Sequence, residues 1–226
     1  MSSKKSGSTS MTLILGGILF LATLVVSTIS IFGAVLLYTS SPFTLYPSRL
    51  FGVSLLPNAE ILSLNFGYST FHYFISDLGI GPSSWLFNTG MVITGIITIA
   101  AFPTLLKPLG STRTGKIGVI LGVIAGAGLI GVGLFPENTG VNHVISAVIY
   151  FFSTFIAIGV LSYANSSTKF FSKYVQWLGY IAFIAGLICT ILISIFGPPP
   201  EWVLIFLVLI WALPLSIDML AKRKSL

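Results

Sequence analysis

The stretch MTLILGGILFLATLVVSTISIFGAVLLYT, at residues 11–39, decides the fold class because it runs for 29 residues without a charged side chain. A helix needs about 20 apolar residues to cross the hydrocarbon core of a membrane. The hydrophobic region of a cleaved signal peptide is shorter, at about 7–15 residues. The stretch therefore predicts a helix that is retained and that spans a membrane.

Five more apolar stretches follow, and the composition of the whole chain agrees with them. Of the 226 residues, 55% are hydrophobic and only 7% are charged, whereas about a quarter of the residues in a soluble domain are charged. This composition excludes a soluble enzyme, a nucleic-acid-binding protein and a disordered chain. We predict an all-α fold, a single polytopic membrane bundle at 11–220 with six transmembrane helices, at about 11–39, 85–106, 117–135, 143–163, 174–196 and 202–220.

The charged residues predict the orientation of the bundle. If the N-terminus lies inside, ten of the eleven basic residues fall on the cytoplasmic side and only Arg49 falls on the other side. Basic residues concentrate on the cytoplasmic side of membrane proteins. We therefore predict a multi-pass protein of the cell membrane with both termini in the cytoplasm. A disordered tail is expected at 1–10 and a basic tail at 221–226. The acidic residues on the predicted outer side are Glu60, Asp77, Glu137 and Glu201.

Glycines are spaced four residues apart in the third predicted span, at Gly118, Gly122 and Gly126. Small residues at this spacing let helix backbones approach closely in lipid. The pattern favours tight packing between helices over a helix that a ligand approaches. A single cysteine, Cys189, excludes a disulfide within the chain.

The longest predicted connection, at residues 40–84 on the outer side, is rich in aromatic residues. A connection of this composition is expected to fold against the bundle or to lie along the membrane surface. Within it, residues 61–66 suit a short strand or an interfacial helix, and the pattern does not separate the two. We predict that residues 68–74 pack over the outer end of the bundle.

Two motifs in the chain resemble a known family. They are FHYFISDLGIGPSSWLFNTGMVITG at 71–95 and GVGLFPENTGVNHVISA at 131–147. A Ser-Asp-Leu-Gly turn before a helix with Phe-Asn, then Gly-x-Phe-Pro and a histidine that opens the next helix, is similar to the domain of unknown function 998 family. The resemblance implies a prokaryotic membrane protein with about six helices, and it implies no reaction.

Polar residues at the ends of the predicted spans converge on the outer side. Ionisable groups near the hydrocarbon are costly, so they tend to face a bundle interior or a watery cavity. We predict a small outer pocket with Tyr68 and His72 at its border, in which Asp77 and His143 lie near each other. The candidate binding residues are Ser76, Asp77, Asn88, Glu137 and His143.

Each of these residues also suits a structural role. Asp77 can accept hydrogen bonds from the backbone amides of its own turn. His143 can pair with Asp77 or Glu137, and Asn88 can form a hydrogen bond between helices. The sequence leaves the structural and the functional interpretation open.

The sequence favours a non-catalytic function. It contains no zinc-protease, P-loop, nucleophile-elbow or paired-cysteine motif. Its two histidines are too few for a multi-histidine metal centre, and we predict no metal and no cofactor. The favoured hypothesis is an accessory or structural membrane component.

Two alternatives remain open. One is a membrane enzyme that acts on a lipid or a small extracytoplasmic substrate, with Asp77 and His143 as the catalytic acid–base pair. The other is a transporter, which ranks third. The expected partners are the lipid bilayer and either another membrane protein or a second copy of the chain, with no nucleic acid.

Overall fold

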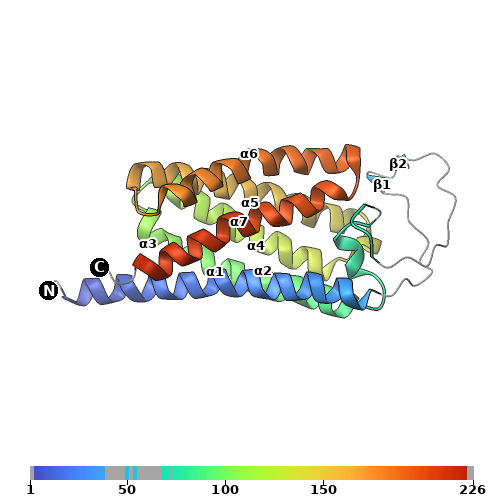
Figure 1. Cartoon of the computed structure of the whole chain (residues 1–226), viewed down its shortest axis with the longest axis horizontal. Helices are drawn as coiled ribbons and strands as arrows, with labels where there is room; N and C mark the ends of the chain where they lie inside the picture. The colour runs from blue at the N-terminus through green and yellow to red at the C-terminus, as the bar shows by residue number, and fades with distance from the viewer. Residues whose placement is uncertain (1–2, 39–48, 51–52, 55–67, 72, 223–226) are drawn as a thin grey trace.

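Six long helices lie side by side along the molecule in the computed structural model (Figure 1), which describes residues 3–38, 49–50, 53–54, 68–71 and 73–222. Within these residues, six helices are long and apolar enough to cross a membrane, which confirms the predicted number. The long helices are α1 (Ser3–Leu37), α2 (Ser84–Ala101), α4 (Arg113–Leu134), α5 (Val141–Thr168), α6 (Lys173–Phe196) and α7 (Pro199–Lys222). The short elements are α3 (Leu106–Leu109), the 3-10 helices η1 (Ser76–Gly79), η2 (Phe102–Leu105) and η3 (Glu137–Thr139), and the strands β1 (Arg49–Leu50) and β2 (Val53–Ser54).

The bounds of the helices differ from the predicted ones, and three of these differences have a clear physical reason. α1 begins at Ser3, inside the tail predicted to be disordered, because a helix extends at little cost once its nucleus has formed. The second span continues beyond residue 106 to Leu109, because Pro103 lies in the first turn of η2, where its missing N–H is tolerated. α5 continues to Thr168 and ends where Lys169 adopts a left-handed conformation, with φ of 51°.

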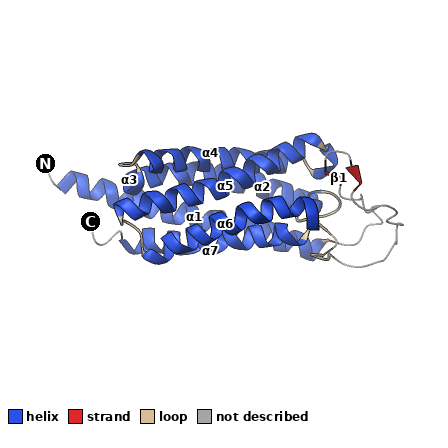
Figure 2. Ribbon diagram, turned by 90° about the horizontal axis from the view of Figure 1, so that it is seen from above, coloured by secondary structure: helices blue, strands red, loops and turns tan. Residues whose placement is uncertain are grey.

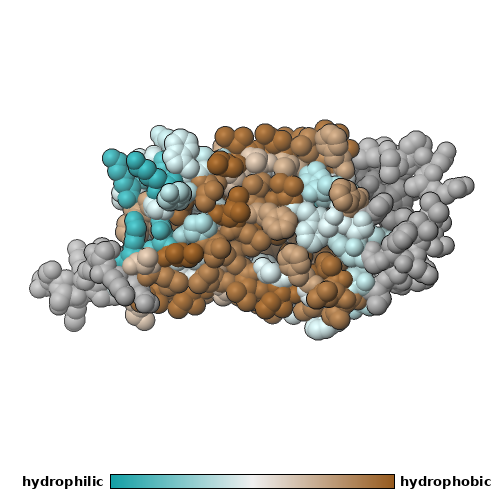
Figure 3. Space-filling model, viewed as in Figure 1, coloured by the Kyte–Doolittle hydropathy of each residue, from teal (hydrophilic) through white to brown (hydrophobic). Residues whose placement is uncertain are grey.

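The start of α1 and the end of α7 lie at the same end of the bundle, and η1 lies at the opposite end (Figure 1). Viewed from above, α1 projects beyond the other helices at the first of these ends (Figure 2). Hydrophilic residues gather there, and a hydrophobic belt lies across the middle of the bundle (Figure 3). We name the two ends the η1 end and the basic end, and the basic residues of the latter are Lys107, Arg113, Lys116, Lys169, Lys173 and Lys222.

The predicted aromatic connection at 40–84 is described only in part. Strands β1 and β2 pair in an antiparallel register that places Arg49 opposite Ser54. Residues 61–66, for which the sequence left a strand or a helix open, lie outside the described residues. From residue 73 onward the chain is described without interruption and leads through η1 into α2.

Glycines bring α4 close to α2 and η2. A Cβ atom on Gly95 of α2 would lie 2.6 Å from the carbonyl oxygen of Gly126 in α4. A Cβ atom on Gly122 would overlap the ring of Phe102. The glycine spacing of α4 therefore serves helix packing, as the sequence predicted.

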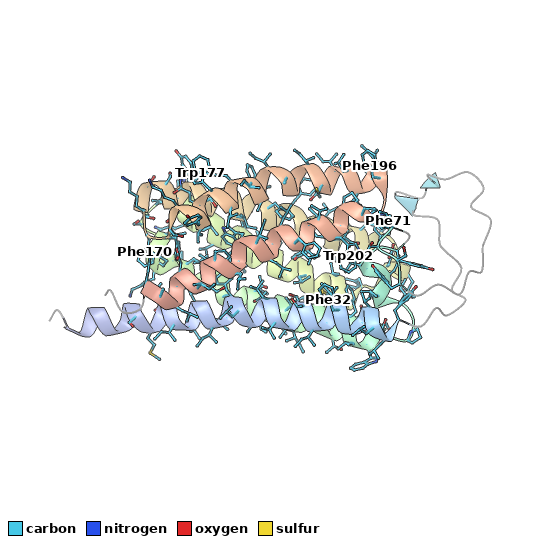
Figure 4. All side chains as sticks on the ribbon, in the orientation of Figure 1. Phe32, Phe71, Phe170, Trp177, Phe196 and Trp202 are labelled. Atoms are coloured by element: carbon cyan, nitrogen blue, oxygen red, sulfur yellow. The ribbon has the colours of Figure 1, made fainter. Side chains whose placement is uncertain are left out.

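α6 presents an apolar stripe on the outside of the bundle. Trp177 and Phe196 lie near its opposite ends (Figure 4) and are 62% and 65% exposed. In contrast, Trp211 of α7 is buried and packs within the bundle. The exposed stripe is spaced three or four residues apart, as lipid contact along one helix face requires, and consists of Ile181, Ile184, Ile188, Ile191 and Ile195.

Candidate functional site

A cavity of about 90 Å³ lies inside the bundle, between α1, α2, α4, α5 and α7. At its deep end, the ring of Phe20 packs edge-on against Phe102 and Trp211, with centroids 5.4 Å and 6.4 Å apart. These three rings form the floor of the cavity, on the side of the basic end. The walls are mostly apolar and include Leu24, Ile31, Phe87, Met91, Leu129, Val132, Phe151 and Ile205.

The end of the cavity nearest η1 is polar. Ser76 of η1, His143 of α5 and Glu201 of α7 line it. The Glu201 side chain is buried, and its Oε2 atom accepts a hydrogen bond from the backbone N–H of Ile75 at 2.6 Å. This bond ties the residue before η1 to the first turn of α7, where an acidic side chain also interacts favourably with the helix dipole.

His143 is held in one orientation by the loop before α5. Its Nδ1 atom lies 2.8 Å from the carbonyl oxygen of Phe135, which can only accept, so Nδ1 donates. The Nε2 atom is then left for a second partner, as an acceptor when the ring is neutral and as a donor when it is charged. Because the buried ring lines the cavity, this nitrogen is the one that remains for chemistry or binding there.

Two more carboxyls lie beside the polar end, behind the residues that line it. The Asp77 and Glu137 carboxyls lie close enough to hydrogen-bond to each other when one is protonated, and the Ser76 hydroxyl donates to Glu137 Oε2 at 3.2 Å. Asp77 Oδ2 accepts a hydrogen bond from the Phe74 N–H at 2.7 Å. A carboxyl donates only when it is protonated, so the bond within the pair requires at least one proton. We refer to Asp77, Glu137 and Glu201 as the acidic cluster.

Burial raises the pKa of both paired carboxyls. Loss of hydration is the largest cause for Asp77, and the hydrogen bonds with Glu137 and Phe74 and the nearby His143 oppose it. Loss of hydration is also the largest cause for Glu137, and the negative charges of Asp77 and Glu201 raise its pKa further. The pair therefore keeps a proton to a higher pH than exposed carboxyls do.

An aromatic collar, made of Tyr38, Tyr68, Tyr73 and Trp202, covers the polar end. The ring of Tyr68 lies 5.4 Å from Tyr38 and 5.8 Å from both Tyr73 and Trp202, measured between centroids. Its hydroxyl donates to the Phe74 carbonyl at 2.7 Å. Burial raises the pKa of Tyr38 to about 12, so this tyrosine is neutral at physiological pH.

The residues that α1 and α7 contribute to the cavity wall are less buried than those of α2 and α4. The residues of α2 and α4 that line it are buried, whereas several lining residues of α1 and α7 are half-buried. Phe32 of α1 and Trp202 of α7 approach each other between these helices (Figure 4), with ring centroids 6.1 Å apart. The half-buried lining residues of these two helices are Thr23, Ser27, Ile205, Val208 and Leu209, and Ala147 and Tyr150 of α5 are half-buried as well.

The structure brings four of the five candidate binding residues together and leaves one apart. Ser76 and His143 line the cavity, and Asp77 and Glu137 lie beside it, with Asp77 in electrostatic contact with His143. Asn88 does not line the cavity; its Nδ2 donates to the Gly79 carbonyl at 3.0 Å and ties η1 to α2. His72, predicted at the border, lies outside the described residues.

Sequence reasoning missed Glu201 as a site residue. The run GPPPEW at 197–202 indicated only a tight outer turn. The signal that was present is a glutamate directly after three prolines, at the first turn of an apolar span. An ionisable residue at that position is costly unless it has a buried partner. Phe71 departs from the expected packing of residues 68–74, because its side chain is 75% exposed.

The described residues offer no arrangement for a metal ion. Among them, no group of three or more histidine, cysteine, aspartate or glutamate side chains is placed to hold one. The acidic cluster uses its oxygens for hydrogen bonds to backbone amides, to Ser76 and within the Asp77–Glu137 pair.

Six membrane-length helices around a buried polar site define a multi-pass helical membrane protein. Residues 59–218 match the family described as protein of unknown function, DUF998. The chain belongs to this family, which confirms the resemblance seen in the motifs at 71–95 and 131–147. No match was found among curated proteins or among solved structures.

Proposed function

We propose that this protein is a non-catalytic membrane component that binds an elongated amphiphile from the outer half of the membrane. The observation that carries the proposal is the cavity, which is polar at one end and apolar along its length. A molecule with one polar headgroup and one hydrocarbon chain matches both parts. Such a molecule would enter from the lipid between α1 and α7, where several residues that line the cavity are half-buried.

The polar end favours a headgroup that donates hydrogen bonds. Glu201 and the Nε2 atom of a neutral His143 are acceptors, and the Ser76 hydroxyl already donates to Glu137. No lysine or arginine is among the described residues that line the cavity, so a carboxylate or a phosphate would lose its hydration there without gaining a cationic partner. A hydroxyl or an amine therefore fits this end of the cavity better than the headgroup of a fatty acid.

We infer that the η1 end faces outward and that both termini lie in the cytoplasm of a cell-membrane protein. The basic end gathers the lysines and Arg113, and the positive-inside rule assigns such an end to the cytoplasm. In a Cys189→Ala background, Thr139→Cys should react with an impermeant thiol reagent added to intact cells. Ser111→Cys should react only after permeabilisation, and the reverse pattern contradicts this orientation. A membrane-protein partner or a second copy stays a prediction.

A second candidate function is a membrane enzyme that acts on a lipid or a small extracytoplasmic substrate. The Asp77–Glu137 pair favours it, since carboxyls that share a proton serve as acid–base groups in enzymes. Against a catalytic role for Asp77 and His143, each already uses one atom in a structural hydrogen bond. Asp77 Oδ2 accepts from the Phe74 N–H, and His143 Nδ1 donates to the Phe135 carbonyl. Transport ranks third, because the aromatic floor closes the cavity toward the basic end.

Binding of probes that differ only in their headgroup tests the proposal. The purified protein in lipid nanodiscs is titrated with octadecan-1-ol, octadecylamine, octadecanoate and octadecane. A ligand that binds only the native state raises Tm. We expect the alcohol and the amine to raise Tm in a concentration-dependent manner, and the other two to raise it less.

Two tryptophan substitutions on α7 locate the binding. Ile205 lines the cavity, so Ile205→Trp should fill it and abolish the shift in Tm. Phe206 is 50% exposed on the outside, so Phe206→Trp adds the same ring without entering the cavity and should keep the shift. Equal effects of the two variants, or no shift with any probe, contradict the proposed function.

A further inference from the structure

Hydroxyl side chains in membrane spans ordinarily donate to a backbone carbonyl three or four residues earlier. Three of the hydroxyls that line the cavity do so. The donor–acceptor distances are 3.0 Å for Thr23, 3.1 Å for Ser27 and 2.8 Å for Thr98. These side chains are satisfied within their own helices and require nothing from the cavity.

Thr94 of α2 and Thr154 of α5 line the same cavity and differ from them. Neither hydroxyl has a hydrogen-bond partner among the residues that the structure describes. Thr94 is only 2% exposed and Thr154 only 6% exposed. An unpaired hydroxyl away from water is costly, and the surrounding hydrocarbon region supplies no bulk water to pair with it. Two such groups in one cavity indicate that their partner comes from outside the chain.

The two hydroxyls lie deeper than the polar end of the cavity. The rise of an α-helix places Thr154 about 16 Å from His143 along α5, and Thr94 about 10 Å from Phe87 along α2. Between these levels, the cavity is lined mostly by apolar side chains that include Leu129, Ala147 and Phe151, and Tyr150 is the polar exception on α5. The cavity thus has two polar levels separated by an apolar stretch.

We propose that Thr94 and Thr154 form a second binding subsite, which hydrogen-bonds an oxygen atom partway along the ligand's hydrocarbon chain. The inference rests on the proposed function, in which the headgroup lies at Ser76, His143 and Glu201. It narrows the ligand class to lipid-like alcohols or amines that carry a hydroxyl or a carbonyl group within the chain.

Water is the competing partner for the two hydroxyls. A buried water is held by about two to four polar groups. At this depth Thr98 is already bonded to a carbonyl, and the neighbouring Phe102 and Ile158 offer no polar side-chain atom. A ligand oxygen is held in addition by the contacts of its chain with the apolar walls. It therefore depends less than water does on the number of polar partners.

The experiment compares three probes of equal chain length on the full-length protein in nanodiscs. Octadecan-1-ol has a headgroup only, octadecane-1,12-diol adds a hydroxyl deep in the chain, and octadecane-1,2-diol adds it at the head. We expect the 1,12-diol to bind about five- to tenfold more tightly than octadecan-1-ol, which is the gain from about one net hydrogen bond. The 1,2-diol should not show this gain.

Valine substitutions assign the gain to the two hydroxyls. Thr94→Val and Thr154→Val remove only unpaired hydroxyls, so both variants should fold and bind octadecan-1-ol normally while they lose the preference for the 1,12-diol. Thr98→Val, on the same wall, is the matched control and should keep that preference.

Each outcome of the comparison bears on one proposal or on both. If octadecan-1-ol and the 1,12-diol bind wild type equally, the hydroxyls do not bind a ligand oxygen, and the inference fails while the proposed function stands. A preference that survives in the Thr94→Val/Thr154→Val double variant also overturns the inference. If none of the three probes binds wild type, the proposed function fails and the inference fails with it.

Discussion

The backbone N–H of Ile75 donates to Glu201 Oε2 at 2.6 Å, across 126 positions of the chain. Ile75 precedes η1 and is 3% exposed, so water does not readily replace this bond. The contact joins the segment that covers the cavity to the first turn of α7. The polar end of the cavity therefore depends on α7 as much as on η1.

Replacement of Glu201 by alanine should lower the free energy of unfolding by about 1–3 kcal/mol, because the buried Ile75 N–H loses its acceptor. Glu201→Gln keeps an acceptor oxygen in the same place and should lose less than half as much. Titration of the purified protein with SDS in mixed micelles measures both losses. Equal losses would show that this hydrogen bond does not hold the segment at Ile75 against α7.

Asp77→Ala should also cost about 1–3 kcal/mol, because the Phe74 N–H and the Glu137 carboxyl lose a partner. His143→Ala should cost a similar amount through its lost bond to Phe135. Since Asp77 and His143 interact electrostatically, the double variant should lose less than the sum of the two. The same SDS titration applies, and additivity within about 0.5 kcal/mol would exclude the interaction.

Stability should fall as the pH rises through the range in which the Asp77–Glu137 pair loses its proton. Both pKa values are raised from their ordinary values of 3.8 and 4.5, so the folded state binds the proton more tightly than the unfolded chain does. The stability that this proton contributes is fully present at a pH below the ordinary pKa values of the two carboxyls. It is lost as the pH rises through their pKa in the folded state. A series of Tm measurements in nanodiscs, from about pH 4 upward, records it.

Variants that stay neutral identify the group responsible for this pH dependence. Glu137→Gln cannot titrate and should flatten the decline of Tm. Glu201 is a buried carboxyl beside the same pair, so Glu201→Gln is measured alongside and should remove a further part of the decline, whereas His143→Gln should not flatten it. A Tm that increases with pH in the wild type would show that the pair does not hold a proton in the folded state.

Gly90→Ala should destabilise the bundle by about 1–3 kcal/mol through overpacking. A Cβ atom on Gly90 of α2 would overlap the side chain of Ser30 in α1. Gly33→Ala is the matched control, because its Cβ atom would meet only the end of the flexible Leu86 side chain, at 2.9 Å. Thermal unfolding in detergent compares the two, and a larger loss for Gly33→Ala would contradict this packing of α1 against α2.

The number of spans and the packing role of the glycines could be predicted from the sequence, because both depend on local patterns. An apolar run of sufficient length forms a span whatever its neighbours are. The spacing of Gly118, Gly122 and Gly126 likewise defines a helix face without reference to the rest of the chain. The ends of the helices were harder to predict. The end of α5 depends on the left-handed conformation of Lys169, and the end of the second span depends on how η2 accommodates Pro103.

The candidate site could be predicted only in part. Ser76, Asp77, Glu137 and His143 lie at span ends on the same side, so topology alone brings them to one end of the bundle. Asn88 was grouped with them although its helix turns another face to the cavity. Successive residues differ by about 100° around a helix, and neighbouring helices decide which face points inward. The face of α2 that lines the cavity consists of Phe87, Met91, Thr94 and Thr98.

The contact between Ile75 and Glu201 could not be predicted, because nothing in the local sequence links residues 126 positions apart. The unpaired hydroxyls of Thr94 and Thr154 could not be predicted from the sequence either. In the sequence they resemble Thr98, whose hydroxyl is satisfied within its own helix. Only the three-dimensional structure separates a threonine whose hydroxyl is bonded within its own helix from one whose hydroxyl has no partner among the described residues.

The placement of α7 in the cavity wall has a consequence for the biosynthesis of the protein. α7 leaves the ribosome after the other four helices that line the cavity, so those helices first meet in the membrane around an unfinished chamber. Until α7 inserts, its place would be open to lipid, and the Ile75 amide would lack its acceptor. Closure of the chamber and capture of its first occupant would then be a single step of assembly.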